Sequence, residues 1–223
     1  MLLTWKSVEG QGNSKKEKEL FLHQEAWQLF NKSMRHFLIS KYLNSNREIN
    51  DFNFYKESSS FKAITDQKIW NKKEGEFEPK TLPIRIKRDC FNKPHLVDYP
   101  DIYFNLSHCK GMVACIIHSR PVGVDVEYMR DFTAPVMGKV CSIEEQNWIR
   151  ESENPEEAFF RLWTLKESYI KTIGLGIQFP MKQVQFKLQS SGKIESNQKG
   201  YRFRQIKIGD TFILASCEKV KGE

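Results

Sequence analysis

The sequence predicts an α+β fold, because helix-like and strand-like patterns fill different stretches of the 223 residues. Two long segments, residues 14–43 and 155–173, carry apolar side chains at helical spacing. Short apolar runs bounded by turn residues instead occupy much of residues 82–127 and 184–216. The apolar content of 39% and the aromatic content of 13% are typical of a folded globular chain.

The first helix is predicted over residues 14–43, with Asn13 or Ser14 as a candidate N-cap. Residues 44–80 are polar and irregular, which predicts surface structure or an inserted loop, and residues 61–70 could add a short helix. The apolar positions that define the first helix are Leu22, Ala26, Trp27, Phe30, Met34, Phe37, Leu38 and Leu43.

After Thr81 the pattern changes to short strands, predicted over residues 82–86, 102–106, 112–117 and 122–127. The compact turn His118-Ser-Arg-Pro121 joins the last two, so we expect them to pair as an antiparallel hairpin.

Helix then returns over about residues 132–150, where Ser142 and Glu145 have the spacing of a capping box. The helix over 155–173 is predicted to stop at Gly174 and Gly176. Three more strands are expected, at residues 184–188, 201–208 and 211–216.

The net charge of +7, from 35 Lys and Arg against 28 Asp and Glu, suits an anionic partner. Nucleic acid, a phosphorylated small molecule and an acidic protein all fit. The basic residues are spread along the chain without a known nucleic-acid-binding motif, so no nucleic-acid partner is predicted.

Cysteine usage and hydropathy indicate a cytoplasmic protein without a membrane partner. The five cysteines are odd in number and form no CxxC pair, which favours reduced thiols. No apolar run approaches the ~20 residues that span a bilayer, and the first residues lack the pattern of a secretory signal.

Two carboxylates share one face of the strand Gly123-Val-Asp-Val-Glu127. Side chains alternate along a strand, so Val124 and Val126 point to the core while Asp125 and Glu127 point together to the other side. Neighbouring carboxylates repel unless a proton or a cation intervenes, and Mg²⁺ binds such oxygens. The alternative is an exposed strand face with two solvated acids.

The helix over 155–173 carries a second set of charged residues. Lys166 falls inside its apolar stripe, whereas Glu167 and Lys171 lie one turn apart at the polar border. An ordinary ion pair with a snorkelling lysine is the simpler alternative, but it explains Lys166 poorly. The stripe itself consists of Leu162, Leu165, Tyr169 and Ile173.

Ser107 and His108 follow a predicted strand in Phe104-Asn-Leu-Ser-His108. Adjacent residues of a strand point to opposite faces, so these two are not a nucleophile and its base. A hydroxyl, backbone amides and a histidine at a strand end can instead hold a phosphate. A histidine satisfied by local hydrogen bonds is the alternative.

Taken in order, these stretches resemble the 4′-phosphopantetheinyl transferases, in particular the surfactin-synthetase-activating type. The resemblance covers residues 92–176, extends to about 217 and is weak over 1–90. The matching stretches are Lys93-Pro94, Phe104-Asn-Leu-Ser-His108, Gly123-Val-Asp-Val-Glu127, Ser142-Ile-Glu-Glu145 and Phe160-Arg-Leu-Trp-Thr-Leu-Lys-Glu-Ser-Tyr-Ile-Lys-Thr-Ile-Gly-Leu-Gly176.

This resemblance implies transfer of 4′-phosphopantetheine from coenzyme A to a serine of an apo acyl or peptidyl carrier protein, with release of 3′,5′-ADP. The family fold is a pseudo-dimer of two similar α/β halves with the site in the cleft between them. On that basis residues 1–100 would form the half on the coenzyme A side, and residues 101–223 the half that carries the metal-binding and catalytic motifs.

The resemblance also implies a role for each candidate residue. Mg²⁺, or Mn²⁺, would be bound by Asp125, Glu127 and Glu167, and catalysis would involve Glu167 and Lys171. The residues expected to contact coenzyme A are Lys93, Ser107, His108, Lys166 and Lys171.

Two departures from the family pattern stand out: Asn92 replaces the usual glycine before Lys-Pro, and Cys109 replaces a second serine after His108. The family's carrier-binding segment matches residues 132–149. A non-catalytic carrier-binding module on the same fold is the main rival hypothesis, and a basic nucleic-acid-binding domain is a second.

Overall fold

The computed structural model describes residues 1–9, 12, 14–43, 53–56, 84–189 and 191–220. The strands are β1 (Leu2–Ser7), β2 (Asn53–Lys56), β3 (Ile86–Arg88), β4 (Pro94–Leu96), β5 (Tyr103–Cys109), β6 (Met112–His118), β7 (Val122–Tyr128), β8 (Phe186–Leu188), β9 (Ile194–Ser196), β10 (Tyr201–Ile208) and β11 (Phe212–Lys219). The helices are α1 (Lys15–Leu43), α3 (Ala134–Val140), α4 (Ile143–Glu151) and α5 (Pro155–Ile173), with short 3₁₀ turns η1 (Gly176–Gln178) and η2 (Met181–Gln183). The mixed α/β composition agrees with the predicted fold class.

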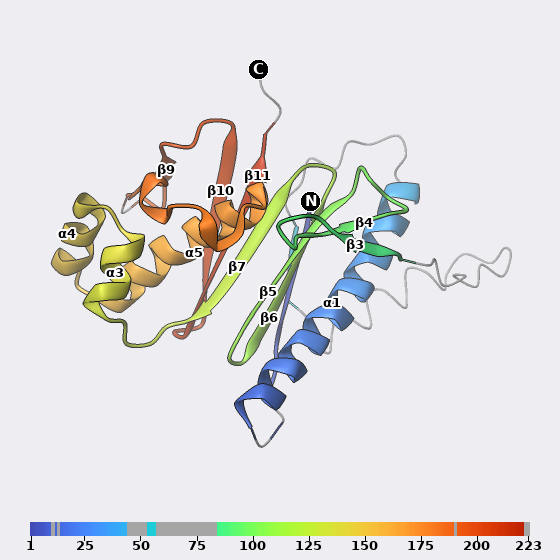
Figure 1. Ribbon diagram of the computed structural model, residues 1–223, viewed down its shortest axis with the longest axis horizontal. Coiled ribbons are helices and arrows are strands. Elements are labelled where there is room, and N and C mark those ends of the chain that lie inside the picture. The colour runs from blue at the N-terminus through green and yellow to red at the C-terminus, as the bar shows by residue number, and fades with distance from the viewer. Residues whose placement is uncertain (10–11, 13, 44–52, 57–83, 190, 221–223) are drawn as a thin grey trace, which may run out of the picture.

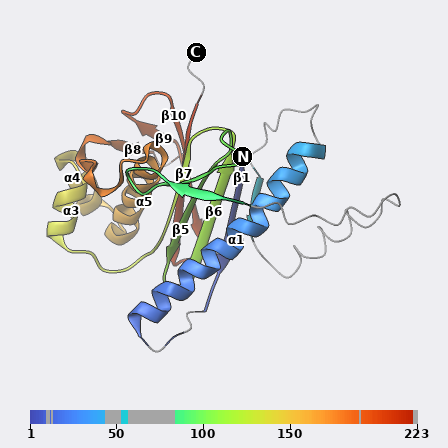
Figure 2. The same ribbon diagram turned by 45° about the vertical axis from the view of Figure 1, so that its right-hand side comes forward.

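Two sheets form the centre of the molecule (Figure 1). One has the strand order β2-β1-β6-β5 and the other the order β10-β11-β7, while β3-β4 and β8-β9 form small separate hairpins. α1 packs against β5 and β6, and α5 packs against β7 and β11. Figure 2 shows the same arrangement from a second direction, with α1 and α5 on opposite sides of the sheets.

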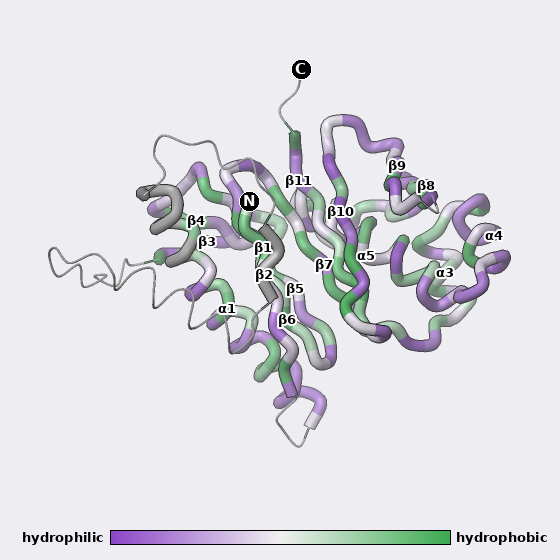
Figure 3. The backbone as a smooth tube through the Cα atoms, turned by 180° about the vertical axis from the view of Figure 1, so that it is seen from behind, coloured by the Kyte–Doolittle hydropathy of each residue, from purple (hydrophilic) through white to green (hydrophobic). Residues whose placement is uncertain are grey.

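The core has three parts because strand side chains alternate between faces. Val113, Cys115 and Ile117 of β6 face α1, whereas the intervening residues of β6 meet Val124 and Val126 of β7 between the two sheets. A third cluster lies around α5. Figure 3 shows hydrophobic residues along the central strands. The prediction that Val124 and Val126 are core residues is confirmed, since they are 0% and 1% exposed.

Strands β5 and β7 lie side by side although they belong to different sheets. Side chains of β5 link them, because Val124 N donates to Asn105 Oδ1 (2.9 Å) and Val126 N donates to Ser107 Oγ (3.2 Å). The expected hairpin of β6 with β7 is therefore wrong: β6 pairs with β5 and β1, and β7 pairs with β11. The turn through Pro121 carries the chain from one sheet to the other.

The helix termini follow the predicted capping chemistry. Ser14 Oγ accepts from Glu17 N at the start of α1, and Ser142 and Glu145 form the expected capping box of α4. That capping box begins a new helix, so the segment 132–150 contains two helices, α3 and α4. Gly174, with a φ of 81°, ends α5 as predicted.

The other predicted strands and helices agree with the structure only in part. The strands expected at 102–106, 112–117, 201–208 and 211–216 are confirmed as β5, β6, β10 and β11, with shifted ends for all but β10. Strands β1, β2, β4 and β9 were not predicted. The helix suggested for residues 61–70 lies outside the described residues, as does most of the segment 44–80.

Within the described part of the chain, no helix is long and apolar enough to cross a membrane.

Backbone contact at Gly123 brings β7 against α5. A Cβ atom built on Gly123 would collide with the carbonyl oxygen of Ser168 and lie 2.6 Å from Thr172 N. Thr172 Oγ1 also donates to Ser168 O (2.7 Å) and to Cys217 O of β11 (3.2 Å). Only glycine permits this approach, so the sheet and the helix are in direct contact at this point.

A buried ion pair ties α5 to α4. Lys166 is 0% exposed, and its Nζ donates to Glu145 Oε2 (2.6 Å). Glu145 in turn accepts from Ser142 N (2.8 Å) and Phe186 N (3.0 Å). The carbonyl oxygens of Val140, Met181 and Val184 complete the surroundings of the ammonium. Lys166, which did not fit the apolar stripe of the sequence, therefore connects α5 to α3, α4 and η2. Through its partner Glu145 it also connects α5 to β8.

We expect Gly123→Ala to lower the free energy of unfolding by about 3 kcal/mol or more, because the added methyl group separates β7 from α5. Gly138→Ala on α3 is the matched control, since a Cβ there meets nothing within 4 Å. That control should gain about 0.5–1 kcal/mol from the lower entropy of the unfolded chain. Urea unfolding measures both, and equal effects would contradict the packing argument.

Lys166→Met should lower the free energy of unfolding by about 3–5 kcal/mol, because it leaves the Glu145 carboxylate buried without its cation. Lys182→Met removes an exposed lysine of η2 and should stay within about 0.5 kcal/mol of the unsubstituted protein. If both variants unfold at the same urea concentration with the same slope, Lys166 does not hold the helices together.

Candidate active site

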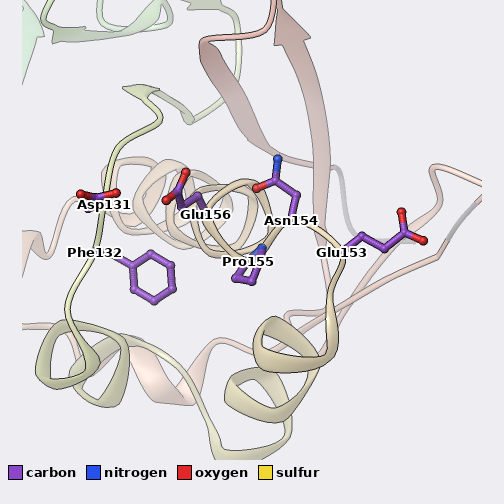
Figure 4. A pocket seen from close by; sticks show the side chains of 6 residues that line it. All are labelled: Asp131, Phe132, Glu153, Asn154, Pro155 and Glu156. Carbon is purple, nitrogen blue, oxygen red and sulfur yellow. The ribbon is translucent and has the colours of Figure 1, made fainter.

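A pocket of about 360 Å³ lies where β5, β7 and α5 meet. Its lining brings together six of the predicted site residues from three elements: Ser107, His108, Asp125, Glu127, Glu167 and Lys171. Leu106 and Trp163 complete the lining. A second pocket lies at the start of α5, between Asp131–Phe132 and residues 153–156 (Figure 4). It contains none of the predicted site residues.

Lys171 is the centre of the hydrogen bonds in the first pocket. Its Nζ donates to Asp125 Oδ1 (2.7 Å) and to Ser107 Oγ (2.9 Å), and Ser107 Oγ donates to Asp125 Oδ1 (3.0 Å). The other carboxylate oxygen of Asp125, Oδ2, is buried and has no hydrogen-bond partner among the described residues. A buried, unpartnered carboxylate oxygen calls for a further donor or cation.

Glu127 and Glu167 complete a cluster of three acids. Burial and the charges of Asp125 and Glu127 together raise the pKa of Glu167 to about 7, against the opposing effect of the Lys171 ammonium. Burial and Asp125 also raise the pKa of Glu127, whose carboxylate pairs with Arg130 (2.8 Å). Both shifts mean that the site disfavours additional negative charge, so it suits a cation.

The three acids do not yet form a metal cage. Among the described residues, no group of three or more His, Cys, Asp or Glu side chains is placed to hold a metal ion. Lys171 occupies one oxygen of Asp125, and Arg130 pairs with Glu127. The donor set and the unpartnered Asp125 oxygen nevertheless fit a hard cation, which prefers carboxylate oxygens and water.

Trp163 and His23 belong to the pocket region, although neither was among the predicted site residues. The indole of Trp163 lines the pocket, and its buried Nε1 has no hydrogen-bond partner among the described residues. The ring of His23 on α1 lies 6.1 Å from the ring of His108, and burial together with the charges of His23 and Lys171 lowers the pKa of His108. Only the tertiary packing of α1 on β5 brings His23 to this place.

Two predicted coenzyme A contacts lie away from the pocket. Lys166 is on the far side of α5, where Glu145 and three carbonyl oxygens take up its ammonium, so the expectation for Lys166 is corrected. Residues 166 and 167 are about 100° apart around the helix, which sends their side chains to different sides. Lys93 donates to Lys171 O and Thr172 O at the end of α5 and is not part of the pocket lining.

Comparison with known proteins finds similarity over the region that contributes β7 and α5 to the pocket. The model of the 4′-phosphopantetheinyl transferase superfamily matches residues 121–217. The chain is 26% identical over 143 residues to the 4′-phosphopantetheinyl transferase Sfp of Bacillus subtilis strain 168, which covers 63% of this chain and 64% of that protein. It is 37% identical over 100 residues to the 4′-phosphopantetheinyl transferase gsp of Aneurinibacillus migulanus, covering 44% of this chain and 41% of that protein.

A further relative, a 4′-phosphopantetheinyl transferase of Bacillus subtilis, is 30% identical over 107 residues and is matched over 47% of its length. The chain thus matches about half, and in no case here more than 64%, of the length of these relatives. The matched residues include Asp125, Glu127, Glu167 and Lys171 of the pocket. Over residues 121–217 the chain is therefore similar to the 4′-phosphopantetheinyl transferase superfamily, and the three relatives named here are 4′-phosphopantetheinyl transferases.

Proposed function

We propose that this chain transfers 4′-phosphopantetheine from coenzyme A to a serine of an apo acyl or peptidyl carrier protein and releases 3′,5′-ADP. The observation that carries the proposal is the convergence of Asp125, Glu127, Glu167 and Lys171 in one pocket, within the region that matches the family. Ser107 and His108 join them from β5, just outside the matched residues. Such a site combines oxygen ligands for a cation with a fixed positive charge for phosphate.

The topology supports a pseudo-dimer with the site in the cleft between two similar halves. Each half contains a first strand, a later long helix and a closing hairpin, and the last strand of that hairpin pairs with the first strand of the half. These elements are β1, α1 and β5–β6 in one half and β7, α5 and β10–β11 in the other, where α3 and α4 precede α5. β6 pairs with both β1 and β5, so β5 and β6 belong to the first half. We therefore place the boundary between the two halves between His118 and Val122, and not at residue 100. The pocket then lies between β5 of one half and β7 and α5 of the other.

Mg²⁺, with Mn²⁺ as an alternative, is the cation that we assign to Asp125, Glu127 and Glu167. When bound, the ion would neutralise the negative charge that develops on the pyrophosphate of coenzyme A. Support comes from the buried, unpartnered Oδ2 of Asp125 and from the raised pKa values of Glu127 and Glu167. Asp125 already pairs with Lys171 and Glu127 with Arg130, but these two cations leave one oxygen of Asp125 unpartnered and the pKa values of both glutamates raised.

The chain's own residues can then bind and activate both substrates. The ammonium of Lys171, the hydroxyl of Ser107 and the ring of His108 would hold phosphate oxygens of coenzyme A. The carrier's serine oxygen attacks the β-phosphorus, and the bond from that phosphorus to the oxygen of the leaving 3′,5′-ADP breaks. Glu167 is the proposed base for the serine proton, because burial raises its pKa toward the working pH.

Electrostatics supports an acidic carrier protein as the partner. The net charge of +7 would steer an acidic protein toward this chain. Within the segment 132–149, Met137 and Val140 are buried in the core, whereas Val136 is 39% exposed and Ile143 is 66% exposed. Of these four, Val136 and Ile143 are therefore the candidates for carrier contact. The cytoplasmic location stays a prediction.

The rival hypotheses leave the pocket unexplained. A non-catalytic carrier-binding module would not need three carboxylates and a lysine gathered in one pocket, and a nucleic-acid-binding surface would be weakened by that acid cluster. The decisive experiment incubates the protein with Mg²⁺, coenzyme A and apo carrier proteins of several kinds, and weighs each carrier by mass spectrometry. Gain of the phosphopantetheine mass supports the transferase. Failure on every carrier would refute it in favour of the binding module.

Asp125→Asn should lower the rate of transfer by about 100-fold or more while the protein stays folded, because one charge of the proposed metal site is lost. Asp210→Asn, in the exposed turn between β10 and β11, is the matched control and should keep full activity. Initial rates of holo-carrier formation and circular dichroism spectra measure the two properties. Full activity of folded Asp125→Asn would remove this residue from the site.

A further inference from the structure

The side chain of Lys93 reaches from the turn between β3 and β4 to the last turn of α5. Its Nζ donates to Lys171 O (2.7 Å) and to Thr172 O (2.8 Å). Carbonyl groups in the last turn of an α-helix have no partner inside the helix. Lys93 therefore satisfies two of these groups, and its charge lies at the negative end of the helix dipole.

The turn that carries Lys93 is held by its own hydrogen bonds. Asp89 Oδ1 accepts from Phe91 N and from Lys93 N, each at 2.9 Å, and Asp89 N donates to Lys93 O (3.0 Å). Asn92 has a φ of 65°, a left-handed conformation that asparagine and glycine adopt most readily. The asparagine that replaces the family's usual glycine thus preserves the shape of the turn that aims Lys93.

The aliphatic part of Lys93 is packed against the end of the helix. A Cβ atom on Gly174 would lie 3.0 Å from Lys93 Cδ, which places the lysine chain directly over the residue that ends α5. Burial also lowers the pKa of Lys93 to about 8. The lysine is therefore partly buried between the turn and the helix, with its ammonium directed at two backbone carbonyls.

The helix end that Lys93 holds carries Lys171, one of the charged residues that line the pocket. Lys171, whose carbonyl accepts from Lys93, sends its own ammonium to Asp125 and Ser107 in the pocket. Glu167 lies one turn earlier on the same helix. A shift of the last turn would therefore move the Lys171 ammonium relative to the acids of β7.

We propose that Lys93 is a positioning residue, which acts on the reaction through the end of α5 and not by contact with coenzyme A. Lys93 fixes the backbone at Lys171, and this sets the place of the Lys171 ammonium against Asp125 and Ser107. The inference rests on the proposed transferase function and assigns Lys93 a role different from the coenzyme A contact that its sequence motif implies.

The kinetic test compares Lys93→Met, Lys93→Arg and the control Lys87→Met, which removes an exposed lysine of the same hairpin. Lys93→Met should lower kcat about tenfold with the KM for coenzyme A within about twofold, because misplaced catalytic groups slow the chemical step. Lys93→Arg should recover most of kcat, since a guanidinium can also donate to two carbonyls. Lys87→Met should match the unsubstituted protein.

The opposite split would overturn the proposal: a raised KM for coenzyme A with an unchanged kcat would mean that Lys93 contacts the substrate. Unchanged values of both would mean that it has no role in the reaction.

Hydrogen–deuterium exchange provides a readout that does not depend on activity. In Lys93→Met, amides at the end of α5, about residues 170–176, should exchange faster, while residues 158–166 keep their protection. If the unsubstituted protein transfers nothing, the proposed function fails, but this exchange pattern still decides whether Lys93 holds the helix. Unchanged exchange at the helix end would mean that the hydrogen bonds of Lys93 do not stabilise the end of α5.

Discussion

The backbone contact between Gly123 and α5 is the constraint on which the site depends. Because Gly123 has no side chain, β7 approaches the helix at Ser168 and Thr172. This contact sets Asp125, two residues further along β7, opposite Lys171, the neighbour of Thr172. On the other edge of β7, Asn105 and Ser107 bind its backbone amides and bring β5 into the same pocket. Three elements distant in sequence thereby meet around a few charged groups.

The buried acids of the pocket repel one another, so the pocket is a candidate for chemistry and not a source of stability. Burial of Asp125, Glu127 and Glu167 together raises the pKa values of the two glutamates, and Lys171 offsets only part of the repulsion. On the opposite side of α5, Lys166 and Glu145 form a closed pair with further backbone partners. Adjacent residues of one helix therefore have different roles: Lys166 holds the fold together, and Glu167 stands in an unsaturated cluster where a cation and phosphates would restore the balance.

Local patterns in the sequence predicted what local physics decides. The length of α5, its end at Gly174 and the capping box of Ser142 follow from helical spacing and cap chemistry, and the alternation in β7 separated its valines from its acids. Tertiary pairing was beyond such patterns: β6 is apolar on both faces, so nothing in it distinguishes β5 from β7 as its partner. Lys166 was recognised as unusual, but its partner Glu145 comes from another helix. His23 and the grip of Lys93 on α5 depend on packing that no spacing reveals.

We propose that the contact between β7 and α5 builds a cation site for pyrophosphate. The most direct test is a crystal grown with Mn²⁺ and coenzyme A, with diffraction measured where manganese scatters anomalously. We predict an anomalous peak bounded by the carboxylates of Asp125, Glu127 and Glu167, with the pyrophosphate beside Lys171. Coenzyme A bound with no manganese at these carboxylates, or with manganese held by other residues, would contradict it.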